Sequence, residues 1–383
     1  MSNSTKILAA IFSLVLLGGA YYLGKISNNY QSTNSVIEKP ASSVQLVRAD
    51  GSYPMKALEK EKIVLKVVQS RVKSLSEFPS IEEGLEDNIS YMEKMGRQAC
   101  AEGQKPDIIL YHEFPLTGYS SGSREKKLKF TIEVPGPETK RLGKLARECD
   151  SYLIFGSYVR DADWPDHILS INTVINREGE VVKRFWKSRN IKRLFKGIEL
   201  TTTTVEGVRD LYRAKYGMEE EFPVLQTEFG NIAVSTVQHD PFVFAAFAMK
   251  GTEIMLRTAT LYMMEDVVET AMTNKFYSAM ANFTLPPDSK YNAGESVIVG
   301  PDGKVLAKHP SKSEDGIIEA EIPIAEFRKN RKIPPYSLEI TQPVFEQYQQ
   351  EVPINHLDLP KEKLPQSGVE MKAMIDSLSR YLN

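Results

Sequence analysis

Side chains able to carry chemistry stand at the ends of apolar runs in this sequence. Glu113 follows the run Asp107–Tyr111 (DIILY). A carboxyl group at the end of a buried strand has a raised pKa unless it is paired, which suits a general base. A second such place is the polar turn Gln238–Pro241, between the apolar strand Ile232–Val237 and a helix-like run, Phe242–Lys250. A tight elbow between strand and helix is where α/β hydrolytic folds present a nucleophile.

The stretch around this elbow, Gly230–Leu256, resembles the nucleophile elbow of the nitrilase (carbon–nitrogen hydrolase) superfamily, most closely its aliphatic amidase branch. In that family the strand ends in a cysteine, and the helix runs on to Ala-Met-Lys-Gly-Ala-Glu, which Ala248–Glu253 matches closely. The resemblance covers Lys62–Arg331. It implies a nitrilase-like αββα four-layer sandwich. It also implies hydrolysis of an amide or nitrile through a thioester, carried by a Cys, a Glu and a Lys.

Two of these three catalytic positions are matched. Glu113 precedes Phe114–Tyr119, which is similar to the run after the catalytic Glu of the family, although His112 stands where the family has Pro. Lys187 ends the segment GEVVKRFWK, which resembles the family segment whose last Lys is catalytic, and Asn172-Thr173 matches an Asn-Thr of the preceding strand. The resemblance therefore implies that Glu113 moves protons and that Lys187 steadies the oxyanion.

The third position, that of the nucleophile, is occupied by Val237, and the elbow is about two residues shorter than in the family. Valine can neither attack nor donate a proton. Thr236 or His239 could substitute only if the elbow shifts, and Thr236 lacks an adjacent base in this scheme. Neither cysteine of the chain lies on an elbow. By this correspondence the thioester mechanism is excluded.

Other family positions are matched in part. Glu199 is the nearest candidate for the second, substrate-orienting Glu, and the Trp- and Gly-rich loop that normally holds the pocket is absent. Arg257 resembles the amidase branch, and Asn282 and Gly294-Glu295-Ser296 fit later blocks of the family. The histidines are scattered and no His/Cys cluster occurs, so neither a metal nor a cofactor is expected.

The elements that must position these residues alternate between strands and helices and then continue in hairpins. Such an order is typical of a two-sheet sandwich with helices outside. Strands are expected at Ile63–Ser70, Asp107–Tyr111, Tyr152–Tyr158, Ile171–Asn176, Glu180–Trp186, Ile232–Val237, Glu295–Gly300, Lys304–Lys308 and Gly316–Ile322. Helices are expected at Ile81–Gly103, Pro137–Cys149, Phe242–Lys250 and Val268–Ala281.

The amino terminus carries an uncharged apolar run, Ile7–Leu23, flanked by Lys6 and Lys25, which indicates a signal anchor or a signal peptide. An anchor would hold the domain outside the cytoplasm, and a cleaved signal would release it. The predicted organisation is residues 1–25 as this segment, 26–60 as a Ser- and Asn-rich linker, 61–331 as the carbon–nitrogen hydrolase domain with an insertion at 201–221, and 332–383 as a C-terminal extension.

Composition excludes some partners. The 383 residues carry a formal net charge of −2, and no basic stripe occurs, so no nucleic acid is expected. Cys100 and Cys149 each lie near the end of a predicted helix that precedes a strand. The sequence allows a disulfide between them, but two separate buried thiols are the favoured interpretation.

These observations leave three alternative hypotheses for the function. The favoured hypothesis is a ligand-binding pseudoenzyme that keeps Glu113 and Lys187 and binds a small amide-, nitrile- or carboxylate-bearing molecule. The second is an active amide hydrolase that uses His239, Thr236 or a Glu113-activated water in place of a thiol. The third is a membrane-tethered assembly protein, and resemblance to the family implies a homo-oligomer in each case.

Overall fold

The computed structural model describes residues 52–119, 123–190, 202–258, 263–289, 293–331, 334, 336–347 and 367–378. The chain divides into two units, Met1–Gln45 and Leu46–Asn383, and all described residues belong to the second. The apolar run Ile7–Leu23 and Glu199 lie outside the described residues. Within the described part of the chain, no helix has the length and apolar character needed to cross a membrane.

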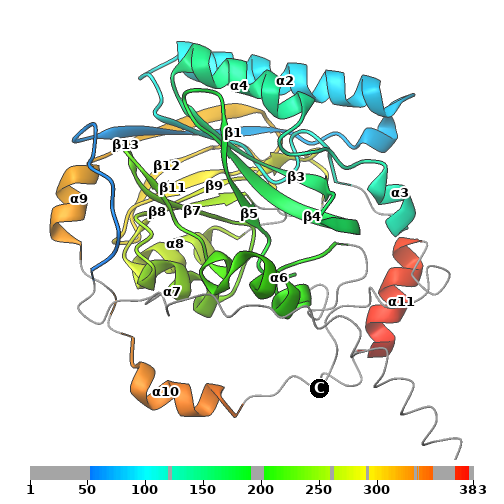
Figure 1. The fold of residues 1–383 in the computed structure, drawn as a ribbon. Helices are drawn as coiled ribbons and strands as arrows, with labels where there is room; N and C mark the ends of the chain where they lie inside the picture. The colour runs from blue at the N-terminus through cyan, green and yellow to red at the C-terminus, as the bar shows by residue number, and fades with distance from the viewer. Residues whose placement is uncertain are drawn as a thin grey trace, which may run out of the picture. The chain divides into compact units, whose positions relative to one another are not determined.

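Two β-sheets lie face to face in this unit (Figure 1). The seven strands of the first sheet are β10 (Phe283–Thr284), β1 (Ile63–Arg71), β2 (Ile108–Leu110), β3 (Tyr152–Asp161), β4 (Trp164–Ile175) and β5 (Val181–Trp186), with β13 (Gly316–Ile322) paired to β1. The six strands of the second sheet are β12 (Val305–Lys308), β11 (Val297–Val299), β9 (Tyr277–Ala281), β8 (Ile254–Thr258), β7 (Gly230–Ser235) and β6 (Leu225–Thr227).

Helices cover the outer faces of both sheets, which completes the αββα layering that the sequence predicts (Figure 1). Helices α2 (Ile81–Ala101) and α4 (Pro137–Cys149) lie on the first sheet, and α7 (Pro241–Met249) and α8 (Met264–Asn274) lie on the second. The other helices of the described residues are α3 (Arg124–Leu128), α6 (Arg209–Tyr216), α9 (Ile324–Asn330), α10 (Leu338–Phe345), α11 (Gly368–Leu378) and the 3-10 turns Leu75–Glu77, Glu206–Val208 and Met218–Glu221.

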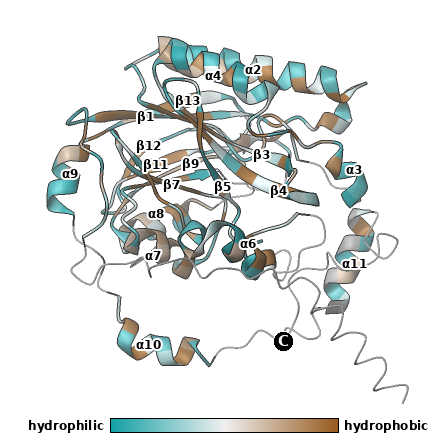
Figure 2. Ribbon diagram, in the orientation of Figure 1, coloured by the Kyte–Doolittle hydropathy of each residue, from teal (hydrophilic) through white to brown (hydrophobic). Residues whose placement is uncertain are grey.

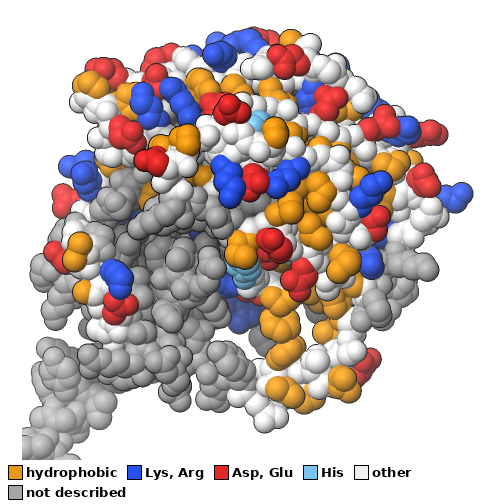
Figure 3. Space-filling model, turned by 180° about the vertical axis from the view of Figure 1, so that it is seen from behind, with side chains coloured by type: hydrophobic (Ala, Val, Ile, Leu, Met, Phe, Trp, Pro, Cys, Tyr) orange, Lys and Arg blue, Asp and Glu red, His pale blue; other side chains and the backbone are white. Residues whose placement is uncertain are grey.

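The apolar pattern of the strands explains these layers. Alternate residues of β1, Leu65 and Val67 among them, point into the core between the sheets, while Val68 packs under the outer helices with Ile89 and Met92 of α2. Because β1 is buried on both faces, its sequence is hydrophobic along most of its length (Figure 2). Helices α2 and α4 instead carry one hydrophobic and one hydrophilic face. Acidic and basic side chains are interspersed on the face seen in Figure 3.

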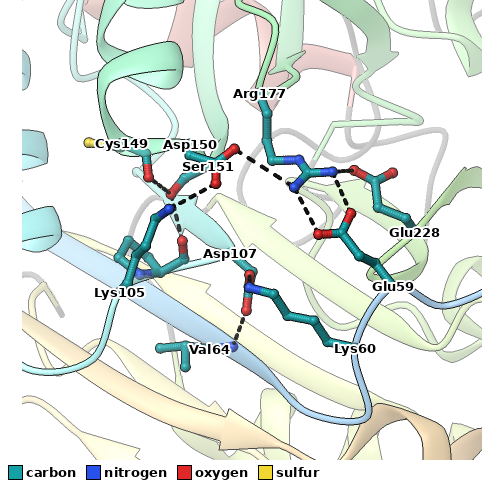
Figure 4. A network of polar contacts seen from close by, with 11 residues as sticks. Glu59, Lys60, Val64, Lys105, Asp107, Cys149, Asp150, Ser151, Arg177 and Glu228 are labelled. Atoms are coloured by element: carbon teal, nitrogen blue, oxygen red, sulfur yellow. Dashed lines mark hydrogen bonds and ion pairs between the residues drawn. The ribbon is translucent and has the colours of Figure 1, made fainter.

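Strand direction decides where the site forms. Strands β1, β2 and β3 are parallel, and β5 runs in the same direction because it is antiparallel to β4, which is antiparallel to β3. In the second sheet β7, β8 and β9 are parallel. At the amino ends of these strands, Arg177 before β5 joins Glu228 before β7 at 3.0 Å and also pairs with Glu59 at 2.6 Å (Figure 4). The carboxyl ends therefore lie at the opposite edge, where Glu113, Lys187 and the elbow follow their strands.

The predicted helix Val268–Ala281 is wrong in its second half. Helix α8 ends at Asn274, Lys275 adopts the left-handed conformation with φ 55°, and Tyr277–Ala281 is strand β9 in the middle of the second sheet. A strand buried on both faces has no alternation of polar and apolar residues, so its short apolar run reads like the continuation of a helix.

The interpretation of Cys100 and Cys149 as separate thiols is also wrong. The two residues form a disulfide with a Cα–Cα distance of 5.7 Å. Helices α2 and α4 precede the parallel strands β2 and β3, so they run in the same direction and their carboxyl ends lie side by side (Figure 1). The disulfide thus joins two helix ends at the amino edge of the sheet, away from the edge that carries Glu113.

Candidate active site

Glu113 is held in the loop that follows β2, with its side chain buried. The loop is fixed to β3, because the Gly156 amide donates to the His112 carbonyl at 3.1 Å. A Cβ atom on Gly156 would lie 2.4 Å from the carbonyl oxygen of Glu113, so only glycine allows this close approach. The strand end and the glycine together place the carboxylate inside the fold.

Lys187 faces Glu113 from the end of β5. Its amide donates to the Ser170 carbonyl at 2.9 Å, which extends the pairing with β4, and its Nζ lies 3.2 Å from Glu113 Oε1. The side chains of Lys187 and Glu113 are only 11% and 3% exposed. The structure therefore brings together two predicted site residues that are 74 positions apart in the chain.

Lys127 of α3 lies near enough to this pair for the charges of both residues to affect its pKa, although the sequence analysis did not single it out. Its side chain is buried, and its Nζ lies 5.0 Å from the ring centroid of Tyr158 and 5.9 Å from that of Tyr119. Burial lowers the pKa of Lys127 to about 8; the nearby charge of Lys187 adds to this effect and that of Glu113 opposes it. In the sequence Lys127 lies in the charged run REKKL, which is typical of a solvated helix, so no local signal distinguishes it.

Beneath these groups, His112 is neutral and fully hydrogen-bonded. Its Nδ1 accepts from the Phe114 amide at 3.2 Å, so Nε2 carries the proton and donates to the Arg71 carbonyl at 3.3 Å. Burial lowers the pKa of His112 to about 4, with smaller opposing effects from the Arg71 carbonyl and the Asp315 charge. The neutral ring therefore joins the backbone just after Glu113 to the end of β1, and a protonated ring could not accept from the Phe114 amide.

The elbow lies at the same edge of the second sheet. Strand β7 ends at Ser235, and Val237 is buried within the core between the sheets. His239 takes the left-handed conformation with φ 51°, and Asp240 caps α7 by accepting from the amides of Phe242 and Val243. The chain thus turns sharply where the sequence predicts an elbow, and the residue at the point of the turn is His239.

Two buried arginines hold this elbow. Arg189, two residues after Lys187, pairs with the Asp240 carboxylate and donates to the Gln238 carbonyl at 3.3 Å. Arg257, at the end of β8, donates to the Val237 carbonyl at 3.0 Å and pairs with Asp266 of α8. The sequence analysis assigned Arg257 to the site but did not single out Arg189. Because Arg189 follows Lys187, it ties the Glu113–Lys187 pair to the elbow.

The other predicted residues have different surroundings. The Thr236 hydroxyl is buried and makes no hydrogen bond to the described residues. His239 Nδ1 lies 3.9 Å from Asp266 Oδ1, and its side chain is 38% exposed. Asn282 binds the Gly294 carbonyl at 3.2 Å, and the Ser296 hydroxyl accepts from its amide at 3.0 Å, so this pair of blocks braces the strand ends rather than facing Glu113.

The cavity found in the described part of the chain lies away from Glu113 and Lys187. A cavity of about 1030 Å³ lies on the outer side of β4 and β5, with Trp164, Trp186 and Tyr216 in its wall, but Glu113 and Lys187 do not line it. Among the residues that the structure describes, no group of three or more His, Cys, Asp or Glu side chains is placed to hold a metal ion.

Sequence comparison relates the chain to known hydrolases. The sequence model of the carbon–nitrogen hydrolase family matches residues 54–332. The omega-amidase NIT2 of Xenopus tropicalis is 25% identical over 215 residues, which is 52% of this chain and 73% of that protein. The bifunctional nitrilase/nitrile hydratase NIT4B of Lupinus angustifolius is 25% identical over 281 residues, covering 62% and 73% of the two chains.

Solved structures show the same architecture. A double mutant of the amidase from Nesterenkonia sp. AN1, in complex with acrylamide, superposes with a TM-score of 0.53 at 18% identity, covering 76% of this chain and 99% of that one. A single mutant of the same amidase, from the nitrilase superfamily, gives a TM-score of 0.55 at 17% identity, covering 74% and 97%. At this identity the likeness establishes the fold, a nitrilase-like αββα sandwich.

Proposed function

The chain belongs to the carbon–nitrogen hydrolase family, and we propose that it is a ligand-binding member without thiol chemistry. In this proposal Glu113 and Lys187 keep the positions of the family's acid–base and oxyanion groups, and Val237 takes the place of the nucleophilic cysteine. The ligand is a small molecule that bears an amide, a nitrile or a carboxylate.

The observation that carries this proposal is that both cysteines of the chain are bonded to each other. The chain has two cysteines, Cys100 and Cys149, and both are consumed in one disulfide at the amino edge of the first sheet. No thiolate is therefore available to form a thioester at the elbow. Val237, two residues after the end of β7, is buried among apolar side chains and cannot attack a carbonyl carbon.

The buried Glu113–Lys187 pair supports binding rather than simple decay of the site. Two charges held away from water cost free energy, and a packed apolar pair of similar volume is often as stable or more so. A pair that serves no purpose can thus be replaced without loss. Relatives of the chain are named an omega-amidase and a nitrilase/nitrile hydratase, which supports an amide, a nitrile or the corresponding acid as the ligand class.

Ammonia release from short aliphatic amides and nitriles, measured on the full-length protein, tests the absence of turnover. We expect none from the wild type, and thermal stabilisation of the wild type by amides or acids that Glu113→Gln abolishes. Activity gained by Val237→Cys but not by Val237→Ala would indicate a pocket that lacks only its nucleophile. Wild-type turnover that Glu113→Gln abolishes would overturn the proposal. If no variant releases ammonia and none is stabilised by the ligands, an assembly role would be favoured.

A second candidate function is hydrolysis with another nucleophile. His239 adopts a left-handed conformation at the turn and lies beside Asp266, and the Thr236 hydroxyl is buried near the end of β7. Against this candidate, Asp266 is already paired with Arg257, which lowers its value as a partner for His239. Wild-type turnover abolished by His239→Gln or Thr236→Val would select this function.

A further inference from the structure

We infer that the cavity beside β5 is a second binding site, which takes an extended peptide segment without acidic residues as an added strand along β5. A large apolar side chain of the bound segment enters the part of the cavity that is lined by Trp164 and Trp186. The inference is independent of the proposed function, because Glu113 and Lys187 do not line this cavity.

Strand β5 has a free edge. It is the last strand of the first sheet, and in the described part of the chain it pairs with β4 alone. Every second residue of an antiparallel strand exchanges hydrogen bonds with its partner strand, and here Lys187 does so, since its amide donates to β4 at 2.9 Å. The N–H and C=O groups of Arg184 and Trp186 therefore point away from β4, and no other described strand or loop pairs with them. Such an edge is a template for a further strand.

The cavity reaches this edge. Its volume is about 1030 Å³, and the adjacent residues Lys183 and Arg184 both line it. Successive side chains of a strand point to opposite faces, so a space over one face alone would contact only one of the two. The cavity therefore extends around the edge of β5. Tyr212 and Tyr216 of α6, which lies beside β5 in Figure 1, also line it, so the predicted insertion 201–221 supplies part of the wall.

Aromatic rings form the part of the cavity wall at the carboxyl end of β5. The rings of Trp164 and Trp186 lie 5.2 Å apart at an interplanar angle of 66°, and those of Trp186 and Tyr212 lie 5.1 Å apart at 69°. Trp164 Nε1 donates to the Tyr216 hydroxyl at 2.8 Å, which fixes these two rings relative to each other. A rigid aromatic wall favours burial of a large apolar side chain, which is the usual anchor of a bound peptide.

The charges of the wall do not favour an acidic ligand. Each lysine and arginine of the wall is paired with an acidic residue of the same wall: Arg184 with Asp161 at 2.6 Å, Lys183 with Glu220 at 2.7 Å and Arg160 with Glu133 at 3.1 Å. The wall also holds the carboxylate of Asp166. An acidic segment would thus find no free cation, whereas the neutral groups of a peptide backbone need only the edge of β5.

Tryptophan fluorescence reports on this cavity directly, because the chain has two tryptophans and both line it. The probe is the tryptophan-free peptide acetyl-Thr-Gln-Thr-Phe-Thr-Gln-amide, with versions that carry Leu, Val, Ala or Glu in place of Phe. We expect the full-length protein to bind the Phe, Leu or Val version with a Kd below about 1 mM, and the Ala and Glu versions about tenfold more weakly. No binding of any version would overturn the site. Glu113→Gln should bind the peptide as the wild type does, so failure here and failure of the proposed function are distinguishable.

Two N-methylated forms of the peptide test whether it is held as a strand. One form carries methyl groups on the amides of its odd residues and the other on those of its even residues. Each form therefore loses the hydrogen bonds of one edge, because the N–H groups of an extended chain alternate in direction. One form should bind as the unmethylated peptide does, and the other at least about tenfold more weakly. Equal binding of both forms would overturn the added strand.

Arg184→Pro tests the same bond from the side of the protein. Proline removes the N–H that points away from β4 and is tolerated in an edge strand at such a position. The matched control is Arg184→Thr, which loses the same side chain and keeps the N–H. Peptide binding should be about fivefold weaker in the Pro variant than in the Thr variant, and equal binding would contradict the inference. If Arg184→Pro does not fold, the two methylated peptides decide.

Discussion

Arg189 donates from Nε to the carboxylate of Asp240, and this bond fixes the segment after Lys187 to the elbow after β7. The two side chains are 7% and 15% exposed. Arg189 also donates to the carbonyls of Asn190 at 2.7 Å and Gln238 at 3.3 Å. One guanidinium thus links the carboxyl ends of a strand in each sheet, and Glu113, Lys187 and the elbow are placed together through it.

Arg189→Met should therefore lower the free energy of unfolding by about 3 kcal/mol or more, because it leaves the Asp240 carboxylate buried without its cation. The matched control is Arg160→Met. Arg160 pairs with Glu133 at 3.1 Å, but both side chains are more than half exposed, so this change should cost below about 1 kcal/mol. Urea denaturation of both variants measures the difference, and equal costs would show that the elbow does not depend on Arg189.

The Glu113–Lys187 pair should show strong coupling in a double-mutant cycle. Glu113→Gln and Lys187→Met each leave one charge of a buried pair behind and should each cost about 3 kcal/mol. The double variant should cost clearly less than the sum, since no buried charge of the pair then remains. Additive costs in chemical denaturation would mean that the two charges do not stabilise each other in the folded protein.

His112 should make the protein sensitive to acid. Its pKa is about 4 in the folded protein against an ordinary value of 6.5, because burial disfavours the charged ring. Between pH 6.5 and pH 4 the unfolded chain binds a proton at His112 that the folded chain does not, so stability falls as the pH falls. The loss should reach about 3 kcal/mol at pH 4.

The comparison that isolates this effect is His112→Gln, whose amide can accept from the Phe114 amide and donate to the Arg71 carbonyl. The pH dependence of unfolding is measured for both proteins from pH 8 to pH 4. The stability gap between wild type and variant should narrow as the pH falls. A gap that stays constant over this range would show that His112 titrates normally in the folded protein.

The disulfide should stabilise the fold without taking part in the site. It closes a loop with a sequence separation of 49, and removing it should lower the free energy of unfolding by about 2–4 kcal/mol. Replacing both Cys100 and Cys149 by Ser tests this, with ligand binding expected to survive. Titration of thiols in the denatured, unreduced protein should find none; a reactive thiol there would also weaken the case against thioester chemistry.

Much of the fold could be predicted from local patterns. The helix Pro137–Cys149 and the strand Gly316–Ile322 occur with the predicted bounds, because their periodicity and their flanking Gly and Pro residues are local signals. Strand β9 was lost to a predicted helix because full burial removes the alternation that identifies a strand. Strand β4 begins at Trp164, earlier than predicted. Its first residues mix polar and apolar types, so they lack the pattern that identifies a strand.

The site was predictable only where a motif carried it. Glu113 and Lys187 each stand in a recognisable run at the end of an apolar strand, and the structure places them in contact. Lys127 and Arg189 have no such run, and the charged segments around them give no local sign that either side chain is buried. Their importance comes from burial, and burial depends on which elements pack over a residue rather than on its neighbours in the chain.

The sequence by itself determined the two-sheet layering, the loop that carries Glu113, the strand end that carries Lys187 and the apolar residue at position 237, since each depends on residue types within a short stretch. Only the tertiary structure decided that Cys100 meets Cys149, that Lys127 turns inward and that Arg189 and Arg257 hold the elbow. These contacts join residues far apart in the chain or buried by other elements. They form because parallel strands bring their ends to one edge, and that arrangement exists only after the sheets have assembled.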